Sequence, residues 1–151
     1  MDRVSEFISA CRGGDVEAVS GMVCEDGTLA DCRAPDEMPA IICATCSHQF
    51  EIVQLLLDAG ADIEAKDTFY KGTALGFAAW HGWDDIATLL VDRGCDVDGV
   101  GEVPSPLALA MDGAAGKLEA EGSPGTQAGH AAIVTLLESR GAAILGRIGS
   151  E

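Results

Sequence analysis

Apolar residues recur at intervals of three and four in three stretches of the chain that read almost alike. The stretches cover residues 48–64, 82–98 and 129–144, and in each a run of Leu, Ile or Val precedes a glycine. This spacing predicts one buried helix face in each stretch. The residues expected on these faces are Ile52, Val53, Leu55, Leu56 and Leu57, then Ile86, Leu89, Leu90 and Val91, then Ile133, Val134, Leu136 and Leu137.

The glycines after the apolar runs set the period of the pattern. Gly60 and Gly94 are 34 residues apart, and Gly94 and Gly141 are 47 apart. A period in the low thirties is typical of a solenoid, in which each short unit buries its apolar face against its neighbours. A glycine at this place favours a left-handed helix C-cap.

A second, shorter pattern precedes each apolar run. Residues 73–79 read TALGFAA, residues 105–111 read SPLALAM, and residues 39–45 read PAIICAT as a poorer copy. Together with the LL..G.D endings, these segments resemble the ankyrin repeat, T-P-L-H-x-A-A-x-x-G-H followed by an apolar helix and L-L-x-x-G-A-D. The resemblance implies an all-α ankyrin-repeat solenoid of about four helix-turn-helix units with β-hairpin-like finger loops.

The resemblance also divides the chain. We expect a single domain over residues 1–151 with repeats at about 1–33, 34–66, 67–100 and 101–147. In the degenerate first repeat, residues 4–12 and 16–23 are the expected helices and residues 13–15 the turn. Thr73 and Ser105 are expected to cap their helices, with Pro106 at the first helical position.

The last repeat contains an insertion over residues 112–128, which reads DGAAGKLEAEGSPGTQA. Its Gly, Ala and Ser content predicts a loop with a helical start at residues 117–120. Two interpretations stay open. The loop is either without fixed structure in the free protein, or it folds over the concave groove and contacts a ligand.

The charge balance narrows the choice of partner. The chain has 9 basic and 25 acidic residues and a net charge of -16. Nucleic acid and anionic membranes require a basic face, so we expect neither as a partner. The excess of acidic residues either favours a basic protein partner or keeps the protein soluble. The N-terminus lacks an apolar run suited to export, and no segment approaches a membrane span, so a cytoplasmic location is expected.

Six cysteines occur without the spacing of a disulfide scaffold, and we expect reduced thiols. Cys11, Cys43 and Cys95 occupy places where the repeat has small residues, which predicts small buried side chains. Cys43, Cys46 and His48 form a C-x-x-C-x-H string, but a zinc site needs four ligands and no second cluster exists. No metal and no cofactor are expected.

The third repeat gathers unusual aromatic residues. Phe69, Tyr70 and Lys71 lie in its finger, which is one residue longer than the pattern, and Trp80 and His81 end its first helix. The resemblance implies that these places share the partner-binding groove, and Tyr and Trp are frequent at binding hot spots. The predicted partner-binding residues are Phe69, Tyr70, Lys71, Trp80, His81, Asp112, Ser47 and Arg12.

The His of the family's T-P-L-H segment is missing from all three copies. Ile42, Gly76 and Ala108 stand in its place. This His normally ties neighbouring loops together, so we expect less rigid fingers. Gly76 also leaves space beside Phe77 and Trp80. Two interpretations stay open: the repeat sequence has simply diverged here, or the space forms a small pocket.

Catalytic chemistry finds little support in the sequence. His81 with Asp84 and Asp85 could act as a base with its orienting carboxylate, but the two aspartates are explained as acidic residues at a helix start. His48 and His130 are expected in turns. The acidic run Asp84, Asp85, Asp92, Asp96, Asp98 and Glu102 faces only Arg93, as a solvated surface or as a patch for a basic partner.

These observations predict a protein–protein interaction module without enzyme activity. We expect it to bind a basic partner through the concave face, as an inhibitor or immunity-type protein. The alternative is a small-molecule binder or unusual enzyme with a pocket near Trp80 and His81, covered by the loop at 112–128.

Overall fold

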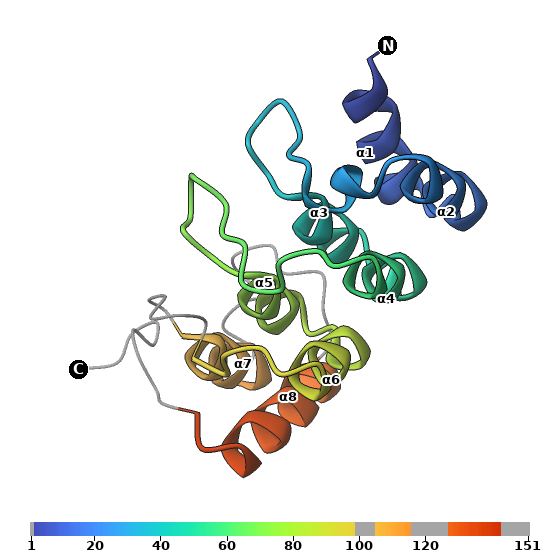
Figure 1. Ribbon diagram of the computed structural model, residues 1–151. Helices are drawn as coiled ribbons and strands as arrows, with labels where there is room; N and C mark the ends of the chain where they lie inside the picture. The colour runs from blue at the N-terminus through green and yellow to red at the C-terminus, as the bar shows by residue number, and fades with distance from the viewer. Residues whose placement is uncertain (1, 99–104, 116–126, 143–151) are drawn as a thin grey trace. The chain divides into compact units, whose positions relative to one another are not determined.

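The computed structural model describes residues 2–98, 105–115 and 127–142, and these residues are largely helical. The chain divides into two compact units, Met1–Lys71 and Gly72–Glu151. The first unit holds the first two predicted repeats and the finger of the third, and the second unit holds the helices of the third and fourth. The expectation of paired helices with turns between them is confirmed in both units (Figure 1).

The first unit contains two helix pairs and one short 3-10 helix. The first pair packs against the second, α1 against α3 and α2 against α4. The degenerate first repeat is therefore a real helix pair. The elements are α1 (Arg3–Gly13), α2 (Val16–Glu25), η1 (Gly27–Asp31), α3 (Ala40–Cys46) and α4 (Phe50–Asp58).

The second unit repeats this arrangement. Its first helices pack on each other, α5 against α7, and its second helices do so too, α6 against α8. No helix in the described ranges is long and apolar enough to cross a membrane. The elements are α5 (Ala74–His81), α6 (Asp84–Asp92), α7 (Pro106–Ala114) and α8 (Gln127–Ser139).

The predicted caps are in place. The hydroxyl of Thr73 accepts a hydrogen bond from the backbone N–H of Gly76 at 3.4 Å, and that of Ser105 accepts one from Ala108 at 3.3 Å. Pro106 begins α7. The three period-setting glycines have φ of 94°, 88° and 78°, the left-handed conformation that ends a helix; they are Gly60, Gly94 and Gly141.

Fewer of the apolar residues are fully buried than the sequence pattern predicted. Ile52, Val53 and Leu56 of α4 have no exposed surface, whereas Leu55 and Leu57 are partly exposed. In the same way, Leu89, Val134 and Leu136 are partly exposed beside fully buried neighbours. A helix with 3.6 residues per turn presents one face to its neighbours, so adjacent apolar residues cannot all be buried.

The limits predicted for the insertion are wrong. Helix α7 continues through residues 112–114, and α8 already begins at Gln127. Residues 116–126, which include the helical start predicted at 117–120, lie outside the described residues. Asp112 and Gly113 are buried in α7, so the first part of the insertion is packed helix rather than loop.

The prediction of a turn at His130 is also wrong, although His48 does lie in a turn with φ of 55°. His130 lies in α8, its side chain is 1% exposed, and its Nε2 hydrogen-bonds the backbone oxygen of Trp80 at 2.9 Å. The ring also fills the space left by two glycines. A Cβ at Gly82 would come within 2.8 Å of the ring and one at Gly113 within 2.0 Å. His130 is therefore a packing residue of the second unit.

The first finger has the hairpin-like form that the resemblance implies. Arg33 and Pro39 form an antiparallel bridge, and the backbone N–H of Ala34 donates to the oxygen of Met38 at 2.9 Å. The tip turns at Glu37, where φ is 67°. Lys71 in the second finger also lies two residues before its helix cap, and its φ is 59°. Both fingers thus hold a non-glycine residue in the left-handed region.

We expect Lys71→Gly to raise the free energy of unfolding by about 1 kcal/mol, because a side chain at positive φ is strained and glycine is not. Chemical denaturation measures this change. Thr68→Gly, an exposed position in the same loop with ordinary φ, is the control and should lower stability by about 0.5 kcal/mol. Equal effects of the two substitutions would contradict the strained conformation of Lys71.

Candidate functional site

The tip of the second finger exposes two aromatic rings. Phe69 is 81% and Tyr70 68% exposed, and within the described residues no other large hydrophobic side chain is so exposed. Their rings meet edge to face with centroids 4.7 Å apart. Two adjacent exposed aromatic residues are unfavourable in water unless a partner covers them, and aromatic residues of this kind contribute much of the energy of protein interfaces.

A buried carboxylate fixes this tip. Asp67 is 3% exposed, and its Oδ2 accepts hydrogen bonds from the backbone N–H groups of Phe69 at 3.1 Å and Tyr70 at 2.8 Å. The aromatic residues are therefore held on an ordered loop. We did not predict a role for Asp67, although an aspartate that opens a loop is a usual signal for such a turn.

Arg33 joins the two fingers of the first unit. Its Nη1 donates to the backbone oxygen of Glu37 at 2.7 Å and to that of Lys66 at 2.9 Å. We expected less rigid fingers because the family's His is missing, but the structure contains this other link. No feature of the sequence pattern marked Arg33. A second link runs from the backbone N–H of Asp62 to Asp31 Oδ1 at 2.6 Å.

Two more predicted binding residues lie in the first unit. The Nη2 of Arg12 is 3.5 Å from Cys43 Sγ and 3.8 Å from Asp36 Oδ2, and its side chain is about half exposed. Arg12 thus reaches from α1 to the first fingertip. Ser47 is partly exposed and follows the last residue of α3.

The remaining predicted residues belong to the second unit. Trp80 and His81 end α5 and are partly exposed, with ring centroids 4.9 Å apart, and His81 also stacks on Trp83 at 5.7 Å. That Trp80 and His81 share a surface with the second finger stays a prediction. Asp112 has no exposed surface, so its predicted contact with a partner is not supported.

The acidic surface follows the second helix of every repeat. Helices α2, α4, α6 and α8 contain no Lys or Arg, and all their carboxylates are exposed. Arg140 pairs with Asp92 at 3.3 Å, which corrects the expectation that Arg93 alone faces this run. The carboxylates are Glu17, Glu25, Glu51, Asp58, Asp84, Asp85, Asp92 and Glu138.

The cysteines behave as packing residues. Cys11, Cys43 and Cys95 are buried, as predicted. Burial raises the pKa of Cys11 and of Cys46 to about 12, which keeps both thiols protonated at neutral pH. In the part of the chain that the structure describes, no group of three or more His, Cys, Asp or Glu side chains could hold a metal ion.

These pKa values predict a loss of stability at alkaline pH. The thiols of the unfolded chain have the ordinary pKa of 9.0, whereas burial raises the pKa of folded Cys11 and Cys46 to about 12. Stability from these groups is therefore fully present below pH 9 and is lost between about pH 9 and about pH 12. Denaturation at several pH values should show that decline. The double variant Cys11→Ala with Cys46→Ala should flatten it, and exposed Cys24→Ala should not.

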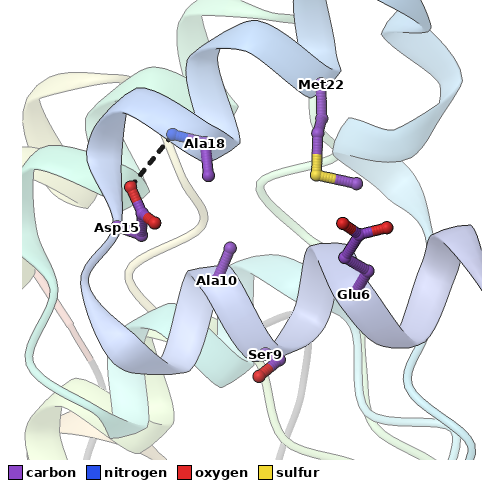
Figure 2. Close-up of a pocket in the computed structure, with 6 residues that line it drawn as sticks. All are labelled: Glu6, Ser9, Ala10, Asp15, Ala18 and Met22. Atoms are coloured by element: carbon purple, nitrogen blue, oxygen red, sulfur yellow. Dashed lines mark hydrogen bonds between the residues drawn. The ribbon is translucent and has the colours of Figure 1, made fainter. Parts of the chain in front are cut away.

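A shallow hollow of about 310 Å³ lies between α1 and α2, where Figure 2 shows Glu6 pointing toward Met22. Its lining includes small side chains and two carboxylates, those of Glu6 and Asp15. No histidine or cysteine is among its lining residues, so it offers no activated nucleophile. The residues are Glu6, Ser9, Ala10, Asp15, Ala18 and Met22.

Comparison with known proteins agrees with this architecture. A family model described as "Ankyrin repeats (3 copies)" matches residues 7–100. Protein phosphatase 1 regulatory subunit 27 of Mus musculus is 34% identical over 104 residues, which are 67% of this chain and 67% of that protein. Ankyrin repeat and SAM domain-containing protein 6 of Rattus norvegicus is 28% identical over 95 residues, 63% of this chain and 11% of that protein.

A third relative, Ankyrin repeat and KH domain-containing protein mask-1 of Caenorhabditis elegans, is 39% identical over 61 residues, 40% of this chain and 2% of that protein. The family match begins within α1 and runs through both fingers described above to the end of α6. The helix pairs, the glycine caps and the finger hairpin agree with it in geometry. The chain belongs to the ankyrin-repeat family.

Proposed function

We propose that this chain is a protein–protein interaction module that binds its partner through the finger side of the repeats. The observation that carries the proposal is the exposed pair Phe69 and Tyr70, held in place by the buried carboxylate of Asp67. Ordering these rings before binding lowers the entropy that association costs. Trp80 and His81, which are partly exposed at the end of α5, are proposed as further partner-binding residues within the second unit.

The partner is proposed to be a basic protein, and the role that of an inhibitor or immunity-type protein. The net charge of -16 and the acidic second helices create a field that attracts a positively charged partner. Such a field raises the association rate and suppresses wrong partners more than it raises affinity. The same charge disfavours nucleic acid and anionic membranes. A cytoplasmic location is part of the proposal.

The relatives suggest one partner to include in a test. One of them is named a regulatory subunit of protein phosphatase 1, so a phosphatase catalytic subunit belongs among the candidates. The hollow between α1 and α2 does not support the alternative of a pocket near Trp80 and His81, because all its lining residues come from the first repeat.

A pull-down with the full chain tests the proposal. We expect the chain to retain a protein at about 0.1 M salt and much less of it at about 0.5 M, because salt screens charge attraction. Mass spectrometry identifies the retained protein, and purified phosphatase catalytic subunit is assayed separately.

The double variant Phe69→Ala with Tyr70→Ala should lower affinity for the retained protein by about tenfold or more while stability stays unchanged. Thr68→Ala, also exposed in the same loop, is the matched control and should bind as the parent does. Equal affinity of the double variant and the control would overturn the role of the finger side.

A further inference from the structure

We propose that the two fingers of the first unit form one bipartite peptide-binding surface, which we call the finger pair (residues 33–39 and 66–71). Its ligand is an extended segment of a partner in which a Lys or Arg lies about three residues from a large apolar side chain. This inference rests on the proposed function and specifies the segment that is recognised.

The first fingertip suits a cation. Asp36 and Glu37 are both exposed. The turn is held by backbone bonds, by Arg33 and by Asp36 Oδ1, which accepts a hydrogen bond from the backbone N–H of Met38 at 3.2 Å. Arg12 approaches Asp36 only to 3.8 Å, which is a loose and exposed ion pair. An incoming Lys or Arg can therefore bind Glu37 and replace Arg12 at Asp36 Oδ2, while Asp36 Oδ1 keeps its bond to Met38.

The second fingertip suits an apolar side chain. Phe69 and Tyr70 offer two rings set at 76° to each other, so their surfaces form a corner rather than a flat face. Lys71 is exposed directly beside Tyr70. Its charge disfavours a second cation at this tip, and the basic residue of the ligand is directed to the first finger. The two tips thus define the direction of the bound segment.

Arg33 links the tip of the first finger to the base of the second. One guanidinium nitrogen bonds the tip of the first finger at the oxygen of Glu37 and the base of the second at the oxygen of Lys66. Successive packed helices are about 8–10 Å apart, and an extended chain advances about 3.3 Å per residue. A separation of about three residues between the basic and apolar side chains follows.

Selection of short random peptides by phage display on the immobilised full chain tests the inference. We expect enriched sequences to contain Lys or Arg about three residues from Leu, Ile, Phe, Tyr or Trp. The absence of any enriched sequence, or enrichment without this pairing, would overturn the finger pair as a peptide reader.

Variants then assign each half of the best enriched peptide. The double variant Phe69→Ala with Tyr70→Ala should lower the affinity for this peptide by about tenfold. Asp36→Asn with Glu37→Gln should weaken it by about fivefold, and this loss should vanish for a peptide whose basic residue is replaced by Gln. Glu6→Gln, an exposed carboxylate on α1 outside the fingers, is the control and should leave affinity unchanged. Losses that do not depend on the peptide's basic residue would refute charge recognition by the first finger.

Arg33→Ala should lower affinity and broaden the spacing that the selection prefers, whereas a purely structural role would lower stability without changing the preferred spacing. Arg33→Lys serves where Arg33→Ala does not fold, since the lysine side chain is shorter and lacks the guanidinium nitrogen that bonds both oxygens. Should the pull-down retain a partner that the finger variants bind equally well, the interaction module would stand and this inference would fail.

Discussion

Gly113→Ala is expected to lower the free energy of unfolding by about 3 kcal/mol or more, because the added methyl group would clash with a buried ring. The added Cβ would lie 2.0 Å from Cδ2 and 2.3 Å from Cγ of His130. The ring cannot move away freely, because it is buried and bonded to the oxygen of Trp80. Urea denaturation measures the loss.

Gly21→Ala is the matched control for Gly113→Ala. Gly21 also lies within a helix, but it is exposed and a Cβ there meets nothing within 4 Å. Alanine favours a helix more than glycine does, so this change should raise stability by about 0.5–1 kcal/mol. Combining Gly113→Ala with His130→Ala should cost less than the sum of the single changes, since the clash is removed. Simple additivity would contradict the predicted contact.

Leu56→Ala should cost about 3 kcal/mol, because the side chain has no exposed surface and its removal leaves a cavity. The neighbouring Leu55→Ala should cost about 1 kcal/mol, because Leu55 is partly in water already. Both residues are leucines in the same apolar stretch of α4. A difference between the two variants therefore reports the effect of burial on the free energy of unfolding. Denaturation midpoints at constant slope give the two values.

Equal costs for the two leucines would mean that the packing face of α4 is assigned wrongly. A larger cost at Leu55 would mean that the helix is turned about its axis. The expected threefold ratio follows from burial alone, as the helix propensity lost is the same in both variants.

The sequence predicted the exposure of the site residues in part, and their role in binding a partner stays a prediction. Phe69, Tyr70 and Lys71 lie at an exposed tip, because a loop with aromatic residues and no apolar periodicity has no core face to bury them. The roles of Asp67 and Arg33 were not predicted, because the sequence does not indicate which backbone groups a charged side chain in a loop will bond. Asp112 was placed on a binding surface, but it lies inside α7.

The sequence by itself determined the repeat, its helix pairs and several of their caps. The period of Gly60 and Gly94, the hydroxyls of Thr73 and Ser105, and the spacing of apolar residues are local signals, and local backbone preferences act within a few residues. These signals hold wherever the helix later packs. The glycine conformations and caps were therefore predicted correctly from the residues alone.

Only the tertiary structure decided which apolar residues are buried, how far α7 extends and what joins the fingers. Leu55 and Leu56 carry the same local signal, and only the contact with neighbouring helices separates them. Helix α7 extends through Gly113, and the ring of His130, 17 positions later, packs against this glycine. Arg33 reaches Lys66 across one repeat. Each of these contacts joins residues distant in sequence, and packing of that kind leaves no periodic trace in the chain.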